Sequence, residues 1–288
     1  MIHAVASIER GTYNVWQAEL LAYSWRRAGI NDPLTFLCAG GEVDIEGAES
    51  VAVRNHSYGE DNLPPNAGYY PPWNKPFGLL EWLQSTNPAS ESVLILDPDM
   101  VAVEQIGQIR AVRGRPLAEG PWWWMGPSLT DPAIRARSRN PDLVASVGVP
   151  MLIHADDLRE VIPGWLRKIH ELRVDAAAGR PGVPADPWVA EMTGYVLAAA
   201  DLGLEHRLHR FTCRPLIHYF GAPPSAFCLS PYPWSKYDYQ PWSEPPRVGA
   251  DMPPQVWEFR EILAEYAGIR RAGTEQAPVN LWPTGTPE

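Results

Sequence analysis

Two aspartates, Asp97 and Asp99, stand directly after a short apolar run, Val93 to Leu96. A short run that is rich in branched side chains and ends at Asp-Pro is typical of a strand buried on both faces. Side chains two positions apart in an extended chain point the same way, and Pro98 ends the ladder, so we expect both carboxylates to face a cleft. A divalent cation with phosphate oxygens as further ligands is the natural occupant between them. The alternative is a polar Asp-Pro-Asp turn.

A histidine and two lysines could complete such a site. His218 ends an apolar segment, and two carboxylates with one imidazole suit Mn²⁺ better than Mg²⁺. Lys75 falls at the start of a predicted helix, where a cation opposes the helix dipole unless it shares an anion. Lys236 could reach the same phosphates as a point charge. The alternatives are a structural histidine and solvated surface lysines.

The segments that must position these residues alternate between strands and helices, which predicts an α/β fold with a doubly wound sheet. Asn74 is the predicted N-cap of the second helix, and Pro163 is expected to break the third into two. Trp188, Met192, Tyr195 and Leu202 are predicted to face inward. The predicted strands are 2–8, 34–39, 50–53, 93–96, 149–154, 205–209 and 215–219, and the predicted helices are 14–28, 74–83, 158–172, 187–202 and 255–272.

Composition excludes several classes of protein. A formal net charge of −10 over 288 residues argues against a general binder of nucleic acid or anionic membranes. The cysteines, Cys38, Cys213 and Cys228, have no short paired spacing, so we expect neither a zinc site nor a disulfide framework. No segment resembles an export signal or a membrane span. These features predict a soluble, cytoplasmic protein.

Six sequence blocks, in order, resemble the plant and algal group of hydroxyproline O-arabinosyltransferases and peptidyl-serine α-galactosyltransferases. They are IHAVASIERGTYNVWQAELL, YYPPWNKPFGLLEWL, VLILDPDMV, VGVPMLIHADDLREVIPGW, WVAEMTGYVLAAADLGL and PLIHYFGAP, and the similarity runs from about Ile2 to about Tyr239. The resemblance implies a single GT-A domain at residues 1–272. Such a domain has a Rossmann-like mixed sheet flanked by helices, here with long loops rich in aromatic residues and proline. Residues 273–288 are expected to form a poorly ordered tail.

The resemblance also implies a metal-dependent Asp-x-Asp site, a nucleotide-sugar donor and retention of anomeric configuration. Asp97 and Asp99 match the Asp-x-Asp motif, and His218 matches the histidine of the late His-Tyr block. Lys75 and Lys236 match the lysines of the Asn-Lys-Pro and Ser-Lys blocks. The expected metal ligands are therefore Asp97, Asp99 and His218, and the expected donor-binding residues are Lys75, Asn74, Lys236, Glu9 and Asp97.

Retention requires either a carboxylate on the far face of the sugar or attack from the side of the leaving group. The candidate catalytic residues are Asp186 and Glu191. Asp186 precedes Pro187, so it could instead cap a helix. Glu191 lies one turn further on, and a carboxylate there is harder to explain as a cap.

The sequence thus predicts a retaining glycosyltransferase that uses Mn²⁺, or Mg²⁺, and a UDP-sugar. It would move a galactose or an arabinofuranose-like sugar to a hydroxyl of a peptide, a glycan or a small molecule. One alternative is a non-catalytic module that binds nucleotide sugars or carbohydrates. Another is a glycoside hydrolase with Asp186 and Glu191 as its two carboxylates, which would leave the Asp97/Asp99 pair unexplained.

Overall fold

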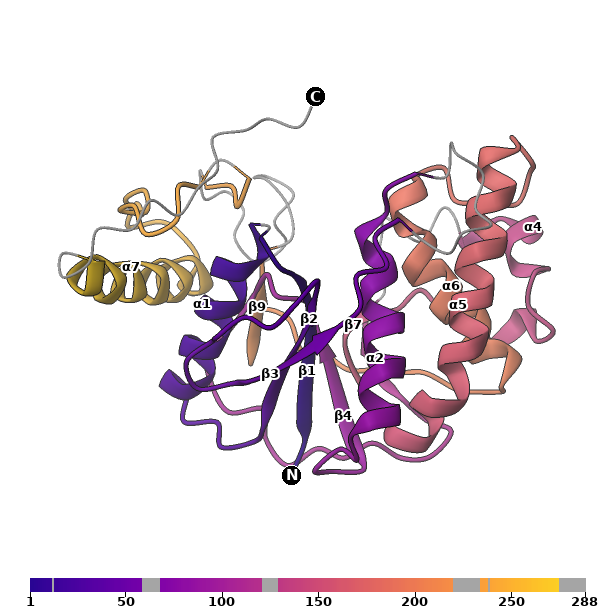
Figure 1. Cartoon of the computed structure of the whole chain (residues 1–288), viewed down its shortest axis with the longest axis horizontal. Helices are drawn as coiled ribbons and strands as arrows, with labels where there is room; N and C mark the ends of the chain where they lie inside the picture. The colour runs from indigo at the N-terminus through magenta and orange to yellow at the C-terminus, as the bar shows by residue number, and fades with distance from the viewer. Residues whose placement is uncertain (12, 59–67, 121–128, 220–233, 238, 275–288) are drawn as a thin grey trace. The chain divides into compact units, whose positions relative to one another are not determined.

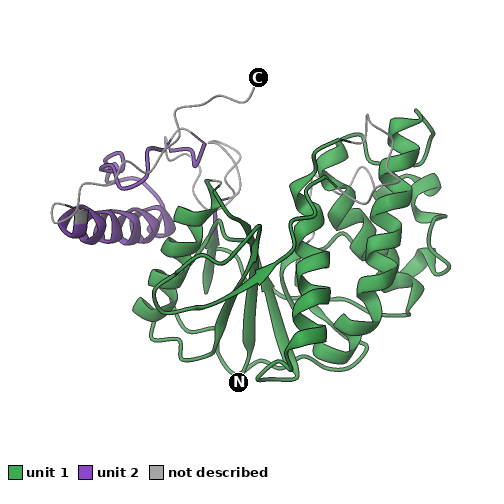
Figure 2. Cartoon of the chain, viewed as in Figure 1, with its two compact units in different colours: residues 1–217 green, residues 218–288 purple. Residues whose placement is uncertain are grey.

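The computed structural model describes residues 1–11, 13–58, 68–120, 129–219, 234–237 and 239–274. The chain divides into two compact units, residues 1–217 and residues 218–288, which Figure 2 shows in different colours. The sequence predicted one domain at 1–272 followed by a tail. The last helix continues through residue 274, and residues 275–288 of the predicted tail lie outside the described part of the chain.

A mixed sheet forms the centre of unit 1, and among the described residues it has seven strands in the order β3-β2-β1-β4-β7-β6-β8. β1 runs parallel to β2 and β4, whereas β7 runs antiparallel to β4 and β6. Every residue of β2 and β4 is buried, as expected of strands covered on both faces. The strands are β1 (His3–Glu9), β2 (Leu34–Ala39), β3 (Glu49–Val53), β4 (Ser92–Leu96), β6 (Leu117–Glu119), β7 (Gly148–His154) and β8 (Arg207–Leu208).

Helices cover both faces of this sheet, which confirms the predicted α/β class (Figure 1). α1 (Asn14–Arg27) lies on one face and α2 (Asn74–Ser85) on the other. The strand order explains this placement. The chain moves from β1 to β2 in one direction and from β3 to β4 in the other, so right-handed crossovers put the two helices on opposite faces. After α1, Gly29 has a φ of +69°, the left-handed conformation that glycine commonly adopts just past the end of a helix.

A helix pair lies beyond α2 on the same side of the sheet (Figure 1). α5 (Ala155–Ala177) follows β7 and packs against α6 (Ala190–Asp201). The prediction that Pro163 divides the first of these helices is wrong, because α5 is continuous through it. Pro163 is exposed, so the carbonyl that loses its N–H partner at Arg159 is on the water-facing side of the helix.

Shorter elements connect the longer ones. Trp188 and Leu202 were predicted to face inward, but they are 56% and 45% exposed. Trp188 belongs to a separate turn of 3₁₀-helix and Leu202 follows the last residue of α6, so the α-helical spacing used for the prediction does not apply to either. The short elements are η2 (Pro71–Trp73), α4 (Pro132–Arg135), η3 (Pro141–Leu143) and η4 (Pro187–Val189).

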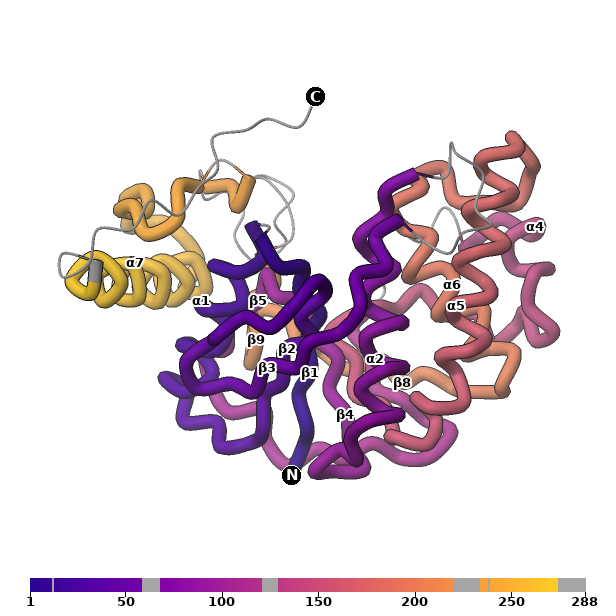
Figure 3. The backbone as a smooth tube through the Cα atoms, in the orientation of Figure 1, coloured from indigo at the N-terminus to yellow at the C-terminus, as the bar shows by residue number. Residues whose placement is uncertain are grey.

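A second sheet pairs β5 (Met100–Ala102) with β9 (Leu216–His218), which lie side by side in Figure 3. The sequence predicted residues 215–219 as a closing strand, but it did not predict β5 as this strand's partner. The boundary between the two units falls inside β9, before its last residue. Unit 2 contains α7 (Pro254–Thr274), and the ring of Trp234 packs edge-on against Phe259 of this helix, with ring centroids 4.9 Å apart.

One cysteine departs from the prediction. Cys38 is free and buried, but Cys213 is disulfide-bonded, so the expectation of no disulfide is wrong there. The lack of a short Cys spacing argues against a metal-binding motif, whereas a disulfide needs only proximity in space. Among the described helices, none combines the length and the apolar character needed to cross a bilayer.

Candidate functional site

Asp97 and Asp99 lie in the connection between the two sheets. β4 of the central sheet ends at Leu96, and β5 of the second sheet begins at Met100. Asp97 is partly exposed and Asp99 is buried. The prediction that Asp-Pro-Asp ends the strand is confirmed, and both carboxylates stand at the carboxyl end of β4, the end at which open α/β sheets bind ligands.

His218 joins these carboxylates as the last residue of β9, the strand paired with β5. The backbone N–H of Val103 donates to the carbonyl of Pro215 at 2.9 Å, which marks the other end of this strand pair. One ligand atom from each of Asp97, Asp99 and His218 lies within 4.8 Å of the other two. We call these three residues the ligand group.

The geometry of the ligand group fits a small divalent cation. Oxygen and nitrogen ligands about 2.1 Å from a shared ion lie at most about 4.2 Å apart. The ligand atoms already lie within 4.8 Å of one another, so small side-chain rotations would bring all three within binding distance of one ion. The donor set of two carboxylates and one imidazole is the set that led the sequence analysis to favour Mn²⁺ over Mg²⁺.

Lys75 links the ligand group to a second carboxylate. It is the second residue of α2, and its Nζ lies 2.9 Å from Oδ1 of Asp97 and 3.3 Å from Oε2 of Glu191. A cation at this end of a helix was expected to share an anion, and here it shares two. Because a carboxylate has two oxygens, Asp97 could contact Lys75 and a metal ion at the same time. We call Lys75, Asp97 and Glu191 the ion-pair cluster.

Glu191 is buried, with 4% of its surface exposed, in the first turn of α6. Its backbone N–H and its backbone carbonyl are both hydrogen-bonded to buried aromatic side chains. The N–H donates to the hydroxyl of Tyr70 at 2.8 Å, and the carbonyl accepts from the indole N–H of Trp165 at 2.8 Å. A buried carboxylate beside a single cation is costly to maintain, so Glu191 is not explained as a surface residue of the helix.

The electrostatics of the ion-pair cluster follow from burial and close charges. Burial raises the pKa of Glu191 above its ordinary value, Lys75 opposes this rise, and Asp97 adds to it. Burial alone would lower the pKa of Lys75, but the ion pairs with Asp97 and Glu191 outweigh it and raise the pKa overall. Lys75 is therefore charged at neutral pH, while the proton affinity of Glu191 is increased.

Asn74 and Glu9 are used in holding loops next to the site. Asn74 is the first residue of α2, so the prediction that it caps the helix is wrong: the N-cap position is Trp73, with no side-chain hydrogen bond. The amide of Asn74 instead accepts from the N–H of His56 at 2.7 Å and donates to Ser57 Oγ at 2.8 Å. The carboxylate of Glu9 accepts from Asn55 and from Tyr69. The predicted contacts of Asn74 and Glu9 with the nucleotide-sugar donor stay predictions.

The two remaining candidates, Asp186 and Lys236, are not members of the ion-pair cluster. Asp186 is exposed, and its carboxylate accepts from the N–H of Trp188 at 2.9 Å, so it caps η4. This is the capping alternative that its place before Pro187 suggested, and a catalytic role stays a prediction. Lys236 belongs to unit 2, where its Nζ lies 5.1 Å from the ring centroid of Tyr237, and its donor contact also stays a prediction.

Sequence reasoning missed Tyr70, which organises this region. It is 2% exposed, and its hydroxyl donates to the carbonyl of Trp188 at 2.7 Å while accepting from Glu191. The guanidinium of Arg173 lies 4.2 Å from the centroid of the Tyr70 ring. No local signal points to this role, because Tyr70 and Trp188 are 118 positions apart.

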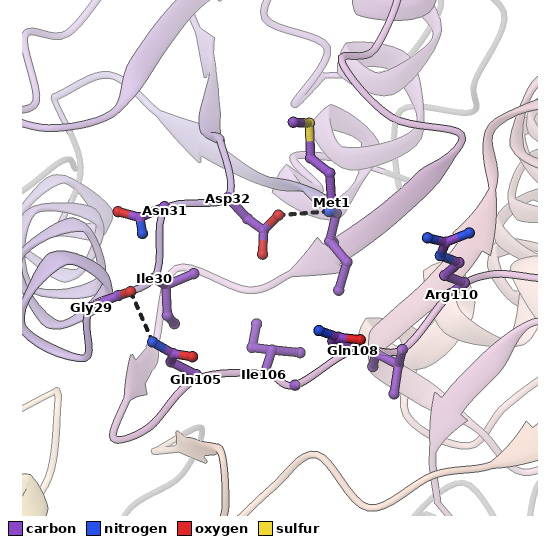
Figure 4. A pocket seen from close by; sticks show the side chains of 12 residues that line it. Met1, Gly29, Ile30, Asn31, Asp32, Gln105, Ile106, Gln108 and Arg110 are labelled. Carbon is purple, nitrogen blue, oxygen red and sulfur yellow. Dashed lines mark hydrogen bonds between the residues drawn. The ribbon is translucent and has the colours of Figure 1, made fainter.

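A pocket lies in another part of unit 1. A pocket of about 640 Å³ is lined by residues 1–2, 29–32 and 105–110 (Figure 4). Its edge includes the bond from the N–H of Ile2 to Oδ1 of Asp32. Ile2 precedes β1 and Asp97 follows the parallel strand β4, so this pocket is at the opposite end of the sheet from the ligand group. It contains none of the predicted site residues.

Comparison with known families gives a match over most of the chain. The model of the hydroxyproline O-arabinosyltransferase family N-terminal domain matches residues 2–208. A peptidyl serine alpha-galactosyltransferase of Arabidopsis thaliana is 31% identical over 217 residues, covering 73% of this chain and 27% of the relative. Hydroxyproline O-arabinosyltransferase 3 of Arabidopsis thaliana is 25% identical over 219 residues, covering 72% of this chain and 58% of the relative.

The chain therefore spans between about a quarter and three fifths of the length of these curated relatives. Among solved structures, the galactosyltransferase LgtC in complex with donor and acceptor sugar analogues aligns with a TM-score of 0.44 and 12% sequence identity. That alignment covers 72% of this chain and 73% of the LgtC chain.

Proposed function

Because the chain belongs to the hydroxyproline O-arabinosyltransferase family, we propose that it is a glycosyltransferase of the GT-A type that uses a UDP-sugar. The reaction moves a galactose or an arabinofuranose-like sugar to a hydroxyl acceptor with retention of anomeric configuration, and it depends on Mn²⁺. The observation that carries this proposal is the ligand group at the carboxyl end of β4, beside the buried cation of Lys75.

The chemistry required by such a reaction matches these residues. The nucleoside diphosphate leaves as an anion, so its departure needs positive charge near the phosphate oxygens. Asp97, Asp99 and His218 would hold the divalent ion, which when bound supplies this charge as a Lewis acid. Lys75 stands 2.9 Å from one of these ligands and can add a second positive contact to the phosphates, provided that it leaves a carboxylate.

Glu191 is the proposed active-site carboxylate. Lys75 pairs with both Glu191 and Asp97, which supports a role for Glu191 beside the proposed phosphate site. In attack from the side of the leaving group, no enzyme residue acts as a nucleophile, and Glu191 would orient the donor sugar or the acceptor. The hydrolase alternative is weaker, because it leaves the ligand group without a role and its second carboxylate, Asp186, caps η4.

A thermal-shift experiment with UDP tests the metal-dependent donor site. We expect UDP to raise the melting temperature with Mn²⁺, less with Mg²⁺ and not at all with EDTA, because a ligand that binds only the folded state stabilises it. Equal shifts from UDP in EDTA and in Mn²⁺ would rule out the metal assignment.

Variants locate the effect at the ligand group. Asp99→Ala is expected to keep the melting temperature of the free protein and to lose both the Mn²⁺-dependent shift and sugar transfer. Asp142→Asn, at an exposed position in η3, is the matched control and is expected to behave like the unchanged protein. An Asp99→Ala protein that still transfers sugar at saturating Mn²⁺ would remove Asp99 from the site, and one that cannot fold would make it structural.

A further inference from the structure

An indole ring is left in water close to the proposed active site. Trp188 is 56% exposed, although it stands only three residues before the buried Glu191. Its ring meets the buried ring of Tyr70 edge-on, with centroids 6.0 Å apart and planes at 78°. A T-shaped contact covers at most one face of the indole, and a tryptophan so placed forgoes much of the burial that usually stabilises it.

The backbone beneath this ring is tightly held. The carbonyl of Trp188 accepts from the hydroxyl of Tyr70 at 2.7 Å, and its N–H donates to the carboxylate of Asp186 at 2.9 Å. The N–H of Val189 donates to the carbonyl of Asp186 at 3.2 Å. The indole is therefore presented on a fixed support, and the loss of entropy on binding a ligand is small.

The same support is shared with the proposed active site. The hydroxyl of Tyr70 that donates to Trp188 also accepts from the N–H of Glu191 at 2.8 Å. Arg173 packs over the Tyr70 ring, with its guanidinium carbon 4.2 Å from the centroid. One hydroxyl group thus holds the backbone of both Trp188 and Glu191. A ligand that packs on the indole would therefore have a fixed position relative to Glu191.

The groups offered at this place select the chemistry of the ligand. The backbone N–H and carbonyl of Trp188 already have partners, so an extended peptide cannot pair with them. What remains is a flat aromatic face beside the exposed carboxylate of Asp186. A sugar ring has a face of C–H groups that packs on the electron-rich face of an aromatic ring, and hydroxyls at its rim that donate to a carboxylate.

We propose that Trp188 is a stacking platform for the sugar ring of a carbohydrate acceptor, with Asp186 accepting hydrogen bonds from the ring hydroxyls. As an acceptor site, this inference rests on the proposed glycosyltransferase function. Trp188 selects the acceptor, whereas the nucleotide-sugar donor binds at the ligand group.

Saturation-transfer NMR with methyl β-D-galactopyranoside tests the platform without needing turnover. We expect the C–H protons of one ring face to receive saturation from the unchanged protein and from Trp188→Phe, and to lose it in Trp188→Ala. Trp257→Ala, which removes another exposed indole, is the control and is expected to keep the signal. UDP with Mn²⁺ is expected to stabilise Trp188→Ala as it stabilises the unchanged protein. With an active acceptor, Trp188→Ala is expected to raise the acceptor KM roughly tenfold.

Several outcomes would overturn the platform. They are an undiminished signal in Trp188→Ala, an equal loss in Trp257→Ala, or Trp188-dependent saturation of a hydroxyproline peptide in place of the glycoside. A glycoside signal that depends on Trp188, in a protein that does not respond to UDP and Mn²⁺, would support the platform as a carbohydrate site and overturn the proposed function instead.

Discussion

Lys75 is the residue through which the two halves of the candidate site interact. Its ammonium group lies between Asp97, a member of the ligand group, and Glu191, the proposed active-site carboxylate. All three side chains are at most 26% exposed to solvent, so water screens their charges poorly. Removing the cation therefore leaves two close carboxylates whose repulsion is not compensated.

Lys75→Met is expected to destabilise the protein by about 3 kcal/mol at neutral pH, because it leaves buried charge unpaired. Without the lysine, the folded-state pKa of Glu191 rises further above its unfolded value. The protonated carboxyl costs little to bury, so the loss of stability is expected to be smaller at low pH and to grow as the pH rises through the folded pKa.

Urea unfolding of Lys75→Met across a pH series measures this effect. Lys75→Arg keeps the charge and is the matched control, with a much smaller expected loss. If Lys75→Met proves as stable as the unchanged protein at every pH, the ion-pair cluster has no energetic role.

His206 gives a second pH dependence with the opposite sign. Burial lowers its pKa to about 4, and its Nε2 lies 2.8 Å from the hydroxyl of Tyr195. Between the unfolded pKa of about 6.5 and the folded pKa, the unfolded chain binds a proton that the native protein does not. Stability is therefore expected to fall as the pH drops through this window, by up to about 3 kcal/mol. His206→Gln should remove this part of the slope, and parallel pH profiles for the two proteins would contradict the assignment.

At the scale of the elements, the packing of α5 against α6 depends on glycine. A Cβ added at Gly194 of α6 would lie 2.8 Å from Cγ1 of Ile169 and 3.1 Å from its backbone nitrogen, both in α5. The two helices therefore approach as closely as a bare Cα permits. This contact also sets the position of Glu191, which is in the first turn of α6.

Gly194→Ala is expected to destabilise the protein by about 1–3 kcal/mol, because the new methyl group forces the helices apart. Gly268→Ala in α7 is the control: a Cβ there meets nothing within 4 Å, so the better helix propensity should stabilise by up to about 1 kcal/mol. Thermal and urea unfolding measure both changes. Equal effects of the two substitutions would show that α5 and α6 can separate without cost.

Elements with strong local signals could be predicted from the sequence. The predicted strand 34–39, for example, has the same bounds as β2. Pro163 was misjudged because the cost of a proline depends on whether the carbonyl it deprives is exposed, which sequence does not report. The pairing of β5 with β9 joins strands that are far apart in the chain, so no local sequence pattern predicts it.

The same division applies to the site. Asp97 and Asp99 carry a local signal, because a spacing of two at a strand end directs both side chains to one cleft. The contact of Glu191 with Lys75 spans 116 positions, so sequence could nominate Glu191 but could not supply its partner. Trp188 was predicted as a core residue because its apolar character was counted without its exposure.

For the molecule as a whole, the stereochemistry of the reaction tests whether these parts act as proposed. We expect the product to retain the anomeric configuration of the donor sugar, which NMR of its anomeric proton reads directly.

Glu191→Gln keeps the shape of the side chain and removes its charge, so transfer should slow by about 10²-fold to 10³-fold. An inverted product would refute the retaining mechanism, and unchanged kcat and KM would return Glu191 to a structural role. A trapped covalent glycosyl-enzyme would make a carboxylate the nucleophile.

The long reach between Lys75 and Glu191 has a consequence during synthesis of the protein. At about 5–20 residues per second, the ribosome needs roughly 6 to 23 seconds to add the 116 positions between them. During that interval the emerging chain holds Lys75, and later Asp97, without Glu191, and His218 follows after Glu191. The nascent chain thus lacks the complete ligand group until all of unit 1 and His218 have left the ribosome. Neither fragment of a gene divided between Lys75 and Glu191 encodes the ion-pair cluster.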